Sequence, residues 1–379
     1  MIRQPDSSLN LIQGYGKIFD ESPAVCARAP GRVNIIGEHT DYNDGFVLPM
    51  AIDRSVWVAC GPGTGESIRC HSNLYGFAEI NLTDIDKHTG DGWTVYIAGV
   101  IAGIRNHGIT VPSLNLYIDS TIPVGKGLSS SAALEVATAL AILEILQIRM
   151  DYRMVADLCR EAEHRYAGMP CGIMDHYASL FGTPGHALLI DCRTGVFQPI
   201  ALDAGYTFML FDSGEDRALV STGYGERRRE CEEALRWLGK YIPDTRSFRD
   251  IDKESFLAYK GRMPRILFKR AFHVLSENNR VIKAVDAVRA GDVKLLGRLM
   301  FKSHGSLSRN FDASTPALDN LVHMAKASCY IAGARLHGGG FGGYTINLVI
   351  AGDFIRARDD IGQEGIPVKT DRGAESWTI

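Results

Sequence analysis

The chain has 379 residues, a formal charge of −3 and an apolar content of 45%. This length exceeds the usual size of a single hydrophobic core, so we expect two lobes, and the apolar content excludes a disordered chain. The small net charge gives no reason to expect nucleic acid or an acidic membrane as partner.

Eight scattered cysteines include no Cys-x-x-Cys pair, which predicts reduced thiols in a cytoplasmic protein. The first residues lack the apolar stretch of a signal peptide. The longest apolar segment, 132–148, is interrupted by Glu135 and Glu144. It therefore predicts a core helix and not a membrane span.

The order of patterns along the chain predicts an α+β fold. Short apolar runs separated by turn residues predict strands and hairpins up to about residue 119. Helical periodicity follows over 132–148 and 152–167, and buried strands are predicted at 187–191 and 207–212. A lobe boundary near Thr194 would divide the chain into residues 1–194 and 195–379.

The second half is predicted to be mainly helical from Tyr224 to about Met300. The basic run Arg227–Arg229 is followed by three glutamates, which predicts a solvated helix face and not a nucleic-acid patch. Residues 344–350 are predicted to form a strand.

A glycine- and serine-rich loop directly precedes the helix predicted from residue 132. Gly125 and Gly127 allow backbone N–H groups to turn toward an anion, and the helix N-terminus adds free donors. The hydroxyls of Ser129–Ser131 could also bind phosphate or Mg²⁺. The loop is not a Walker A motif, because Lys126 is followed by glycine. A serine-capped helix start would look the same, so the loop alone leaves both interpretations open.

A second glycine-rich segment lies near the C-terminus. Gly338, Gly340 and Gly343 match the spacing G-x-G-x-x-G, but the strand predicted at 344–350 stands where a dinucleotide fingerprint needs a helix. We expect instead a turn whose missing side chains leave room for a triphosphate or a sugar.

Charged residues gather in an otherwise apolar segment that contains Arg32, Glu38, His39 and Asp41. Carboxylates are well suited to holding sugar hydroxyls. A polar surface turn is the alternative, and it fits residues 43–45 better than Glu38.

Two further carboxylates lie close to predicted helices. Asp175 begins a helical stretch, where capping is the usual role, and Glu163 lies twelve residues earlier. Near a phosphate loop, one of them could bind a metal and the other could act on the nucleophile.

The motifs together resemble the galactokinase family of the GHMP kinases. Residues 31–43 are similar to the galactokinase signature, and 127–132 to the superfamily phosphate loop. Segments 162–164, 171–175 and 338–343 complete the resemblance, which extends from about residue 24 to the end of the chain.

The resemblance implies ATP-dependent phosphorylation of the anomeric hydroxyl of α-D-galactose between two α+β lobes. It implies Asp175 as the catalytic aspartate beside the cation Arg32, with Mg²⁺ at Ser131 and Glu163. We expect a monomer whose partners are a small sugar and ATP. The implied sugar positions are Glu38, His39, Asp41, Gly172 and Tyr224. The implied nucleotide positions are Trp93, Tyr96, Gly125, Gly127, Leu128, Ser129, Ser130, Ser131 and Ala132.

The sequence departs from the family pattern at three places. His337 replaces the usual threonine, His176 replaces the usual glutamine, and residues 308–311 read Ser-Arg-Asn-Phe. For both histidines we favour a packing or hydrogen-bonding role. The departures leave N-acetylgalactosamine, L-arabinose and galacturonate open as substrates.

Two other functions are alternatives. A non-catalytic sugar sensor would be expected to lack part of the phosphate loop, but the triple serine and Asp175 are intact. A kinase for mevalonate or homoserine would not need the hydroxyl-binding segment that contains Glu38 and Asp41.

Overall fold

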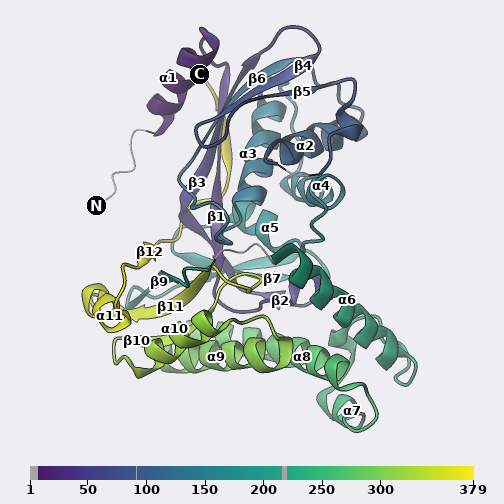
Figure 1. Cartoon of the computed structure of the whole chain (residues 1–379), viewed down its shortest axis with the longest axis vertical. Helices are drawn as coiled ribbons and strands as arrows, with labels where there is room; N and C mark the ends of the chain where they lie inside the picture. The colour runs from purple at the N-terminus through teal and green to yellow at the C-terminus, as the bar shows by residue number, and fades with distance from the viewer. Residues whose placement is uncertain (1–6, 91, 216–219) are drawn as a thin grey trace.

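The computed structural model describes residues 7–90, 92–215 and 220–379. Two sheets with helices packed on them form an upper and a lower part of the molecule (Figure 1). A short three-stranded sheet lies between the two parts. The predicted α+β class is confirmed.

The upper part contains a six-stranded sheet in the order β13-β1-β3-β6-β4-β5, antiparallel except for the β4–β6 pair. Helices α3 and α5 pack against β1 on one face, and α1 packs against the other face (Figure 1). Every residue of β1 is therefore buried. The strands are β1 (Val25–Asn34), β3 (Pro49–Pro62), β4 (Ser67–Ser72), β5 (Gly76–Asn81), β6 (Leu114–Ser120) and β13 (Glu375–Thr378).

The helices of the upper part form a layer in which α3 lies between the sheet and the pair α2 and α4. Because it is covered all round, α3 has buried residues on every face. The helices are α1 (Ser7–Phe19), α2 (Thr94–Asn106), α3 (Ser130–Ile145), α4 (Tyr152–Arg165) and α5 (Met174–Phe181), with a 3₁₀ turn η2 (Ile85–Lys87).

The lower part contains an antiparallel sheet in the order β10-β11-β9-β12, and helices α9 and α10 pack on it. Its strands are β9 (Tyr206–Asp212), β10 (Ile331–Leu336), β11 (Tyr344–Ile350) and β12 (Ile366–Val368). The sheet between the two parts consists of β2 (Phe46–Val47), β7 (His186–Asp191) and β8 (Val196–Ala201).

The remaining elements are mostly helices of the second half, as predicted. They are η1 (Asp41–Asn43), α6 (Val220–Gly239), η3 (Phe248–Asp250), α7 (Lys253–Leu257), α8 (Arg265–Arg289), α9 (Val293–Ser306), the π-helical turn η4 (Leu307–Phe311), α10 (Pro316–Ala327) and α11 (Phe354–Ile361). The last strand, β13, returns to pair with β1. The division at residue 194 stays a prediction.

Two helices in the first third were missed, because only strands and hairpins were predicted there. The segment that forms α2 is rich in valine and isoleucine, which favour strands. It is helical because it packs on α4 at two small residues. A Cβ at Gly99 would lie 2.8 Å from the Cβ of Ala162, and one at Gly103 would lie 2.7 Å from Leu158.

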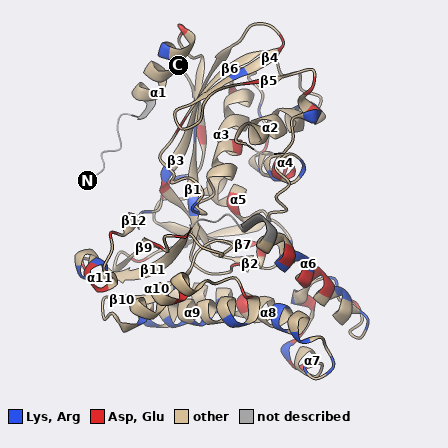
Figure 2. Cartoon of the chain, viewed as in Figure 1, with Lys and Arg blue, Asp and Glu red and all other residues tan. Residues whose placement is uncertain are grey.

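The prediction that the basic run on α6 is a solvated face is wrong for Arg227, which is buried. Its guanidinium contacts Glu230 at 2.9 Å and Asp312 at 3.2 Å. Charges of both signs do lie along α6 (Figure 2), and Arg229 is exposed. Arg227 instead faces η4, because α6 packs against α8.

Replacement of Gly297 by alanine should destabilise the fold, because α9 and β10 touch backbone to backbone at this residue. A Cβ there would lie 1.9 Å from the carbonyl oxygen of Ala332. We expect a loss of at least about 2 kcal/mol, more than the helix-propensity gain of about 1 kcal/mol. The urea midpoint measures this. The control Gly261→Ala points into open space and should change stability by less than about 0.5 kcal/mol; equal midpoints for the two variants would contradict the packing argument.

Candidate active site

A cavity of about 640 Å³ brings together most of the site residues that the sequence predicted. Its wall includes the phosphate loop, the segment after β1, the start of α5 and the glycine turn between β10 and β11. The predicted residues that line it are Arg32, Glu38, His39, Asp41, Trp93, Tyr96, Gly125, Gly127, Ser129, Ser130, Ser131, Glu163, Asp175 and Tyr224. Of the described residues that we predicted, Leu128, Ala132 and Gly172 lie outside this lining.

Arg32 and Asp175 form a two-pronged ion pair in this cavity. Arg32 Nε lies 2.7 Å from Asp175 Oδ1, and Nη2 lies 2.8 Å from Oδ2. The pairing of β1 with β3 shifts register between Pro30 and Arg32, and such a bulge redirects a side chain. Asp175 lies in the first turn of α5, but Ile173 is the N-cap. Asp175 therefore does not cap α5.

The phosphate loop is tied to the same ion pair. Arg32 Nη1 donates to the carbonyl of Gly127 at 2.7 Å, and the hydroxyl of Ser129 donates to Asp175 Oδ2 at 2.5 Å. Ser129 has a left-handed backbone (φ 58°) and its side chain does not cap α3. A strained residue of this kind is common where a loop is held in one functional shape. The simple serine-cap interpretation is thus wrong for Ser129.

The close approach of loop and strand depends on Gly31. A Cβ at this residue would lie 2.6 Å from the carbonyl oxygen of Leu128. That oxygen accepts a hydrogen bond from the backbone N–H of Arg32 at 3.2 Å. Leu128 and Ala132 are both buried, so they support the loop from behind and do not face the cavity.

Glu38 is buried and paired with an arginine that the sequence analysis did not identify. Arg335 Nη2 lies 2.5 Å from Glu38 Oε1, which also accepts from the N–H of Gly338 at 2.9 Å. Burial nevertheless raises the pKa of Glu38, and the nearby guanidinium of Arg335 opposes that rise. The signal for Arg335 was a single arginine in the apolar strand β10, three residues before the first glycine of the glycine run.

His39 has a left-handed backbone conformation (φ 62°), and both of its ring nitrogens make contacts. Its Nδ1 lies 2.8 Å from the hydroxyl of Tyr42, and its Nε2 lies 3.2 Å from the carbonyl oxygen of Gly339. The ring packs on Phe311 and Tyr224, with centroid distances of 4.5 and 5.6 Å. Burial lowers the pKa of His39 well below its usual value, so the imidazole is neutral.

The side chain of Asp41 packs directly against Gly172, where the missing glycine side chain leaves room for it. A Cβ at Gly172 would lie 2.2 Å from Asp41 Oδ2, so only glycine fits there. Burial, followed by the charge of Asp175, raises the pKa of Asp41 to about 7. Asp41 thus holds a proton over a pH range in which an ordinary aspartate has lost it.

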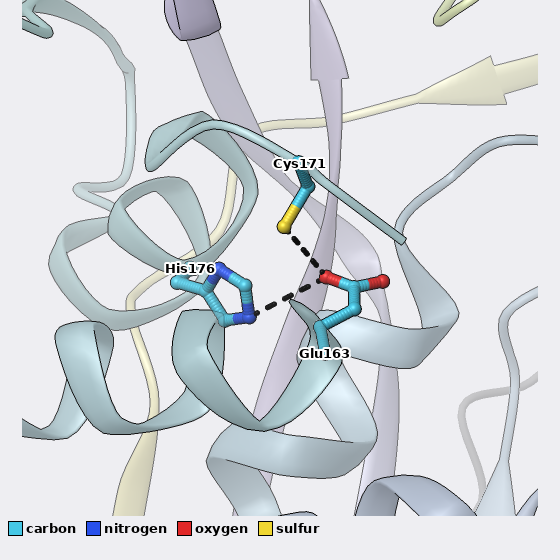
Figure 3. A group of neighbouring side chains, drawn as sticks. All are labelled: Glu163, Cys171 and His176. Atoms are coloured by element: carbon cyan, nitrogen blue, oxygen red, sulfur yellow. Dashed lines mark hydrogen bonds and ion pairs between the residues drawn. The ribbon is translucent and has the colours of Figure 1, made fainter. Parts of the chain in front are cut away.

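Glu163 joins the phosphate loop through one of its two oxygens. Oε1 accepts from the hydroxyl of Ser131 at 2.9 Å. Oε2 lies 3.1 Å from Cys171 Sγ and 3.8 Å from His176 Nε2 (Figure 3). Burial raises the pKa of Glu163 to about 7. The carboxylate oxygen and the hydroxyl are hard ligands of the kind that Mg²⁺ prefers.

Two predicted aromatic residues also line the cavity. They are Trp93, which is the N-cap of α2, and Tyr96. Tyr75, which the sequence analysis missed, stacks on Trp93 at a centroid distance of 6.1 Å and an interplanar angle of 16°. Flat apolar surfaces of this kind suit a planar base.

The glycine run forms a turn between β10 and β11, as predicted, and the dinucleotide interpretation is excluded by the strand that follows. A Cβ at Gly340 would lie 2.1 Å from the carbonyl oxygen of Ala313. Gly338 and Gly339 line the cavity.

Both unusual histidines are buried next to charged site residues. His176 Nε2 lies 2.7 Å from Glu135 Oε2, so the expected hydrogen-bonding role of His176 is confirmed. His337 Nε2 lies 3.4 Å from Arg32 Nη1 and its Nδ1 lies 3.9 Å from Glu38 Oε1. His337 therefore contacts both Arg32 of the ion pair and Glu38.

The comparisons with known proteins agree with this geometry. Residues 13–62 match the galactokinase galactose-binding signature, 95–183 the N-terminal domain of GHMP kinases and 284–351 their C-terminal domain. The structure is similar to that of a Lactococcus lactis galactokinase complexed with galactose, with a TM-score of 0.93 and 28% identity over 97% of this chain and 99% of that one. A mevalonate kinase structure, at 19% identity and a TM-score of 0.65, shares the fold. Fold and signatures together define a GHMP kinase.

Relatives found by sequence identify the family within the GHMP kinases. The chain is 40% identical to a galactokinase of Roseiflexus sp. over 90% of its own length and 87% of that protein. It is 42% identical to a galactokinase of Thermotoga neapolitana over 88% of its length and 92% of that protein. The chain belongs to the galactokinase family.

None of the helices within the described part of the chain has the length and apolar character that a membrane span requires. The cytoplasmic location and the monomeric state stay predictions.

The raised pKa of Asp41 predicts a pH-dependent gain of stability on replacement by asparagine. Its pKa in the folded chain, about 7, exceeds the ordinary value of 3.8. The free energy of unfolding should therefore fall as the pH rises between about 4 and 7. Asp41→Asn should be more stable than the parent by about 2 kcal/mol at pH 8, with little difference near pH 4.

Thermal unfolding across this pH range measures the effect. Asp157→Asn, at an exposed position on α4, is the matched control and should follow the parent at every pH. A constant difference between Asp41→Asn and the parent would contradict the shifted pKa.

Proposed function

We propose that the protein transfers the γ-phosphoryl group of ATP to the anomeric hydroxyl of α-D-galactose. The observation that carries this proposal is the Arg32–Asp175 ion pair. It lies in one cavity with the phosphate loop and with the segment that contains Glu38 and Asp41. Family membership supports galactose as the substrate.

The residues of the cavity fit a magnesium nucleotide. Ser131 and Glu163 offer a hydroxyl and a carboxylate that already share a 2.9 Å hydrogen bond. Within the described residues, no lysine or arginine forms an ion pair with Glu163, so the carboxylate lacks a cation. Bound Mg²⁺ would neutralise charge on the phosphates. The adenine base would lie against Trp93 and Tyr96. The phosphates would be surrounded by Gly125, Gly127, Ser129, Ser130 and Ser131. Leu128 and Ala132 would support this loop from its buried side.

Asp175 is placed to accept the proton of the anomeric hydroxyl. Ser129 and Arg32 Nη2 both donate to its Oδ2, whereas Arg32 Nε is the one donor to Oδ1 among the described residues. Oδ1 therefore keeps a lone pair for the sugar. The guanidinium keeps the carboxylate oriented, and the remaining catalysis comes from positioning and electrostatics.

The sugar hydroxyls would meet Glu38, His39, Asp41 and Tyr224, with Gly172 giving Asp41 its space. His39 is suited to this role because its ring is packed against Tyr224 and Phe311, and Asp41 lines the same cavity. A fixed row of acceptors recognises the orientation of hydroxyls at little entropic cost.

An ADP-release assay with Mg-ATP tests the proposal. We expect galactose to give a higher kcat/KM than N-acetylgalactosamine, L-arabinose or galacturonate, and mevalonate to give no ADP above background. A higher value for one of the related sugars would replace galactose as the substrate. Absence of sugar-dependent ADP with all of them would favour the sensor.

Asp175→Asn should lower kcat by about 10²–10⁴-fold and change the dissociation constant of galactose only a few-fold. The amide keeps the size of the side chain but cannot take the proton. Turnover follows from ADP release and binding from calorimetry. Asp157→Asn serves again as a surface control with parental kcat. Near-normal turnover of Asp175→Asn would remove this residue from its role.

A further inference from the structure

Behind Glu163, a group of potential metal ligands lies on the side away from Ser131. The ligand atoms of Glu163, Cys171 and His176 all lie within 4.8 Å of one another. Sγ of Cys171 and Nε2 of His176 both face the same oxygen, Oε2 of Glu163 (Figure 3). Oε1 faces Ser131. The two oxygens of one carboxylate thus serve two chemically different surroundings.

The spacing of these atoms suits a small tetrahedral ion. Glu163 Oε2 lies 3.1 Å from Cys171 Sγ and 3.8 Å from His176 Nε2. A zinc ion at about 2.0–2.3 Å from its ligands separates them by roughly 3.3–3.7 Å. All three atoms lie within 4.8 Å of one another, so the side chains need to move by about 1 Å or less, which small rotations about their side-chain torsions can supply.

The type of ligand separates this group from a magnesium site. Mg²⁺ takes oxygen ligands in octahedral geometry and does not favour a thiolate or an imidazole. A thiolate, a carboxylate and a neutral imidazole are ligands of Zn²⁺ or Cd²⁺. The two anionic ligands would balance a divalent charge, which matters because Glu163 and His176 are buried.

The surroundings orient two of the three ligands. Glu135, fully buried on α3, places Oε2 2.7 Å from His176 Nε2, and its Oε1 has no hydrogen-bond partner among the described residues. Among those residues its one ion-pair partner is His176. His164 Nε2 lies 2.7 Å from the carbonyl oxygen of Cys171 and fixes that backbone.

We propose that Glu163, Cys171 and His176, with solvent as fourth ligand, form a binding site for a thiophilic divalent cation such as Zn²⁺. Binding replaces the thiol proton of Cys171, which is released to solvent, and takes Oε2 of Glu163 into the coordination sphere. His176 binds as the tautomer that carries its proton on Nδ1, so that Nε2 exchanges its hydrogen bond with Glu135 for the cation. Because Glu163 is also the proposed magnesium ligand, occupancy of the site inhibits the kinase. The inhibition rests on the proposed function, whereas the binding does not.

Direct titration of the full chain with Cd²⁺, under a non-thiol reductant, tests the binding. We expect a thiolate-to-cadmium charge-transfer absorption in the ultraviolet that saturates at one equivalent. Cys171→Ser should abolish it. The exposed Cys329 offers the matched control, because Cys329→Ser should keep the full signal. Absence of the absorption in the parent, or its persistence in Cys171→Ser, would overturn the site.

A second variant covers the case in which Cys171→Ser fails to fold. His176→Gln retains an amide that can donate to Glu135 but is a poor metal ligand. We expect Cd²⁺ affinity to fall at least ten-fold in this variant, with parental thermal stability in metal-free buffer. Unchanged affinity would show that His176 is not a ligand.

Inhibition is measured as ADP release against Zn²⁺ at several Mg²⁺ concentrations. The half-inhibiting Zn²⁺ concentration should rise at least ten-fold in His176→Gln and should also rise with Mg²⁺ in the parent. Cd²⁺ binding without Zn²⁺ inhibition would overturn the inhibitory role. If no sugar gives ADP, the proposed kinase function fails, and the titration still decides whether the metal site exists.

Discussion

The guanidinium of Arg32 holds the site together, because it connects its own strand to two segments that are far away in the sequence. It donates to both oxygens of Asp175 and to the carbonyl of Gly127, while its own backbone belongs to β1. A buried guanidinium that lost one of these partners would be costly. The strand, the phosphate loop and the start of α5 therefore have one arrangement relative to one another. The bulge after Pro30 is the backbone feature that directs Arg32 into this position.

The electrostatics of the rest of the site follow from burial of more acids than nearby bases can balance. Burial raises the pKa of Glu38, Asp41 and Glu163, although Arg335 contacts Glu38 directly. Such a site gains from a divalent cation and from hydroxyl donors, which are the groups that a magnesium nucleotide and a sugar bring. On the far side of Glu163, Oε2 faces a thiol and an imidazole, and these are the ligands that the proposed thiophilic cation would take.

Local motifs predicted much of this site. The phosphate loop could be found because glycines and serines before a helix have a direct backbone consequence. Arg335 and Tyr75 could not be found in the same way. Each is an ordinary residue in an ordinary strand or hairpin, and its importance arises from a partner distant in the sequence. Arg227 was misplaced for the same reason, since its burial depends on η4.

The sequence by itself determined the chemistry that is available, because residue types and short-range spacing are properties of a contiguous segment. It specified the glycines at tight turns, the strand after the last glycine run and the helix after the triple serine. Only the tertiary structure decided which oxygens of Asp175 and Glu163 face which partners. It also decided that α2 is a helix, because Gly99 and Gly103 meet α4. Hydrogen bonds, burial and close packing join residues far apart along the chain, and no local pattern encodes their distances.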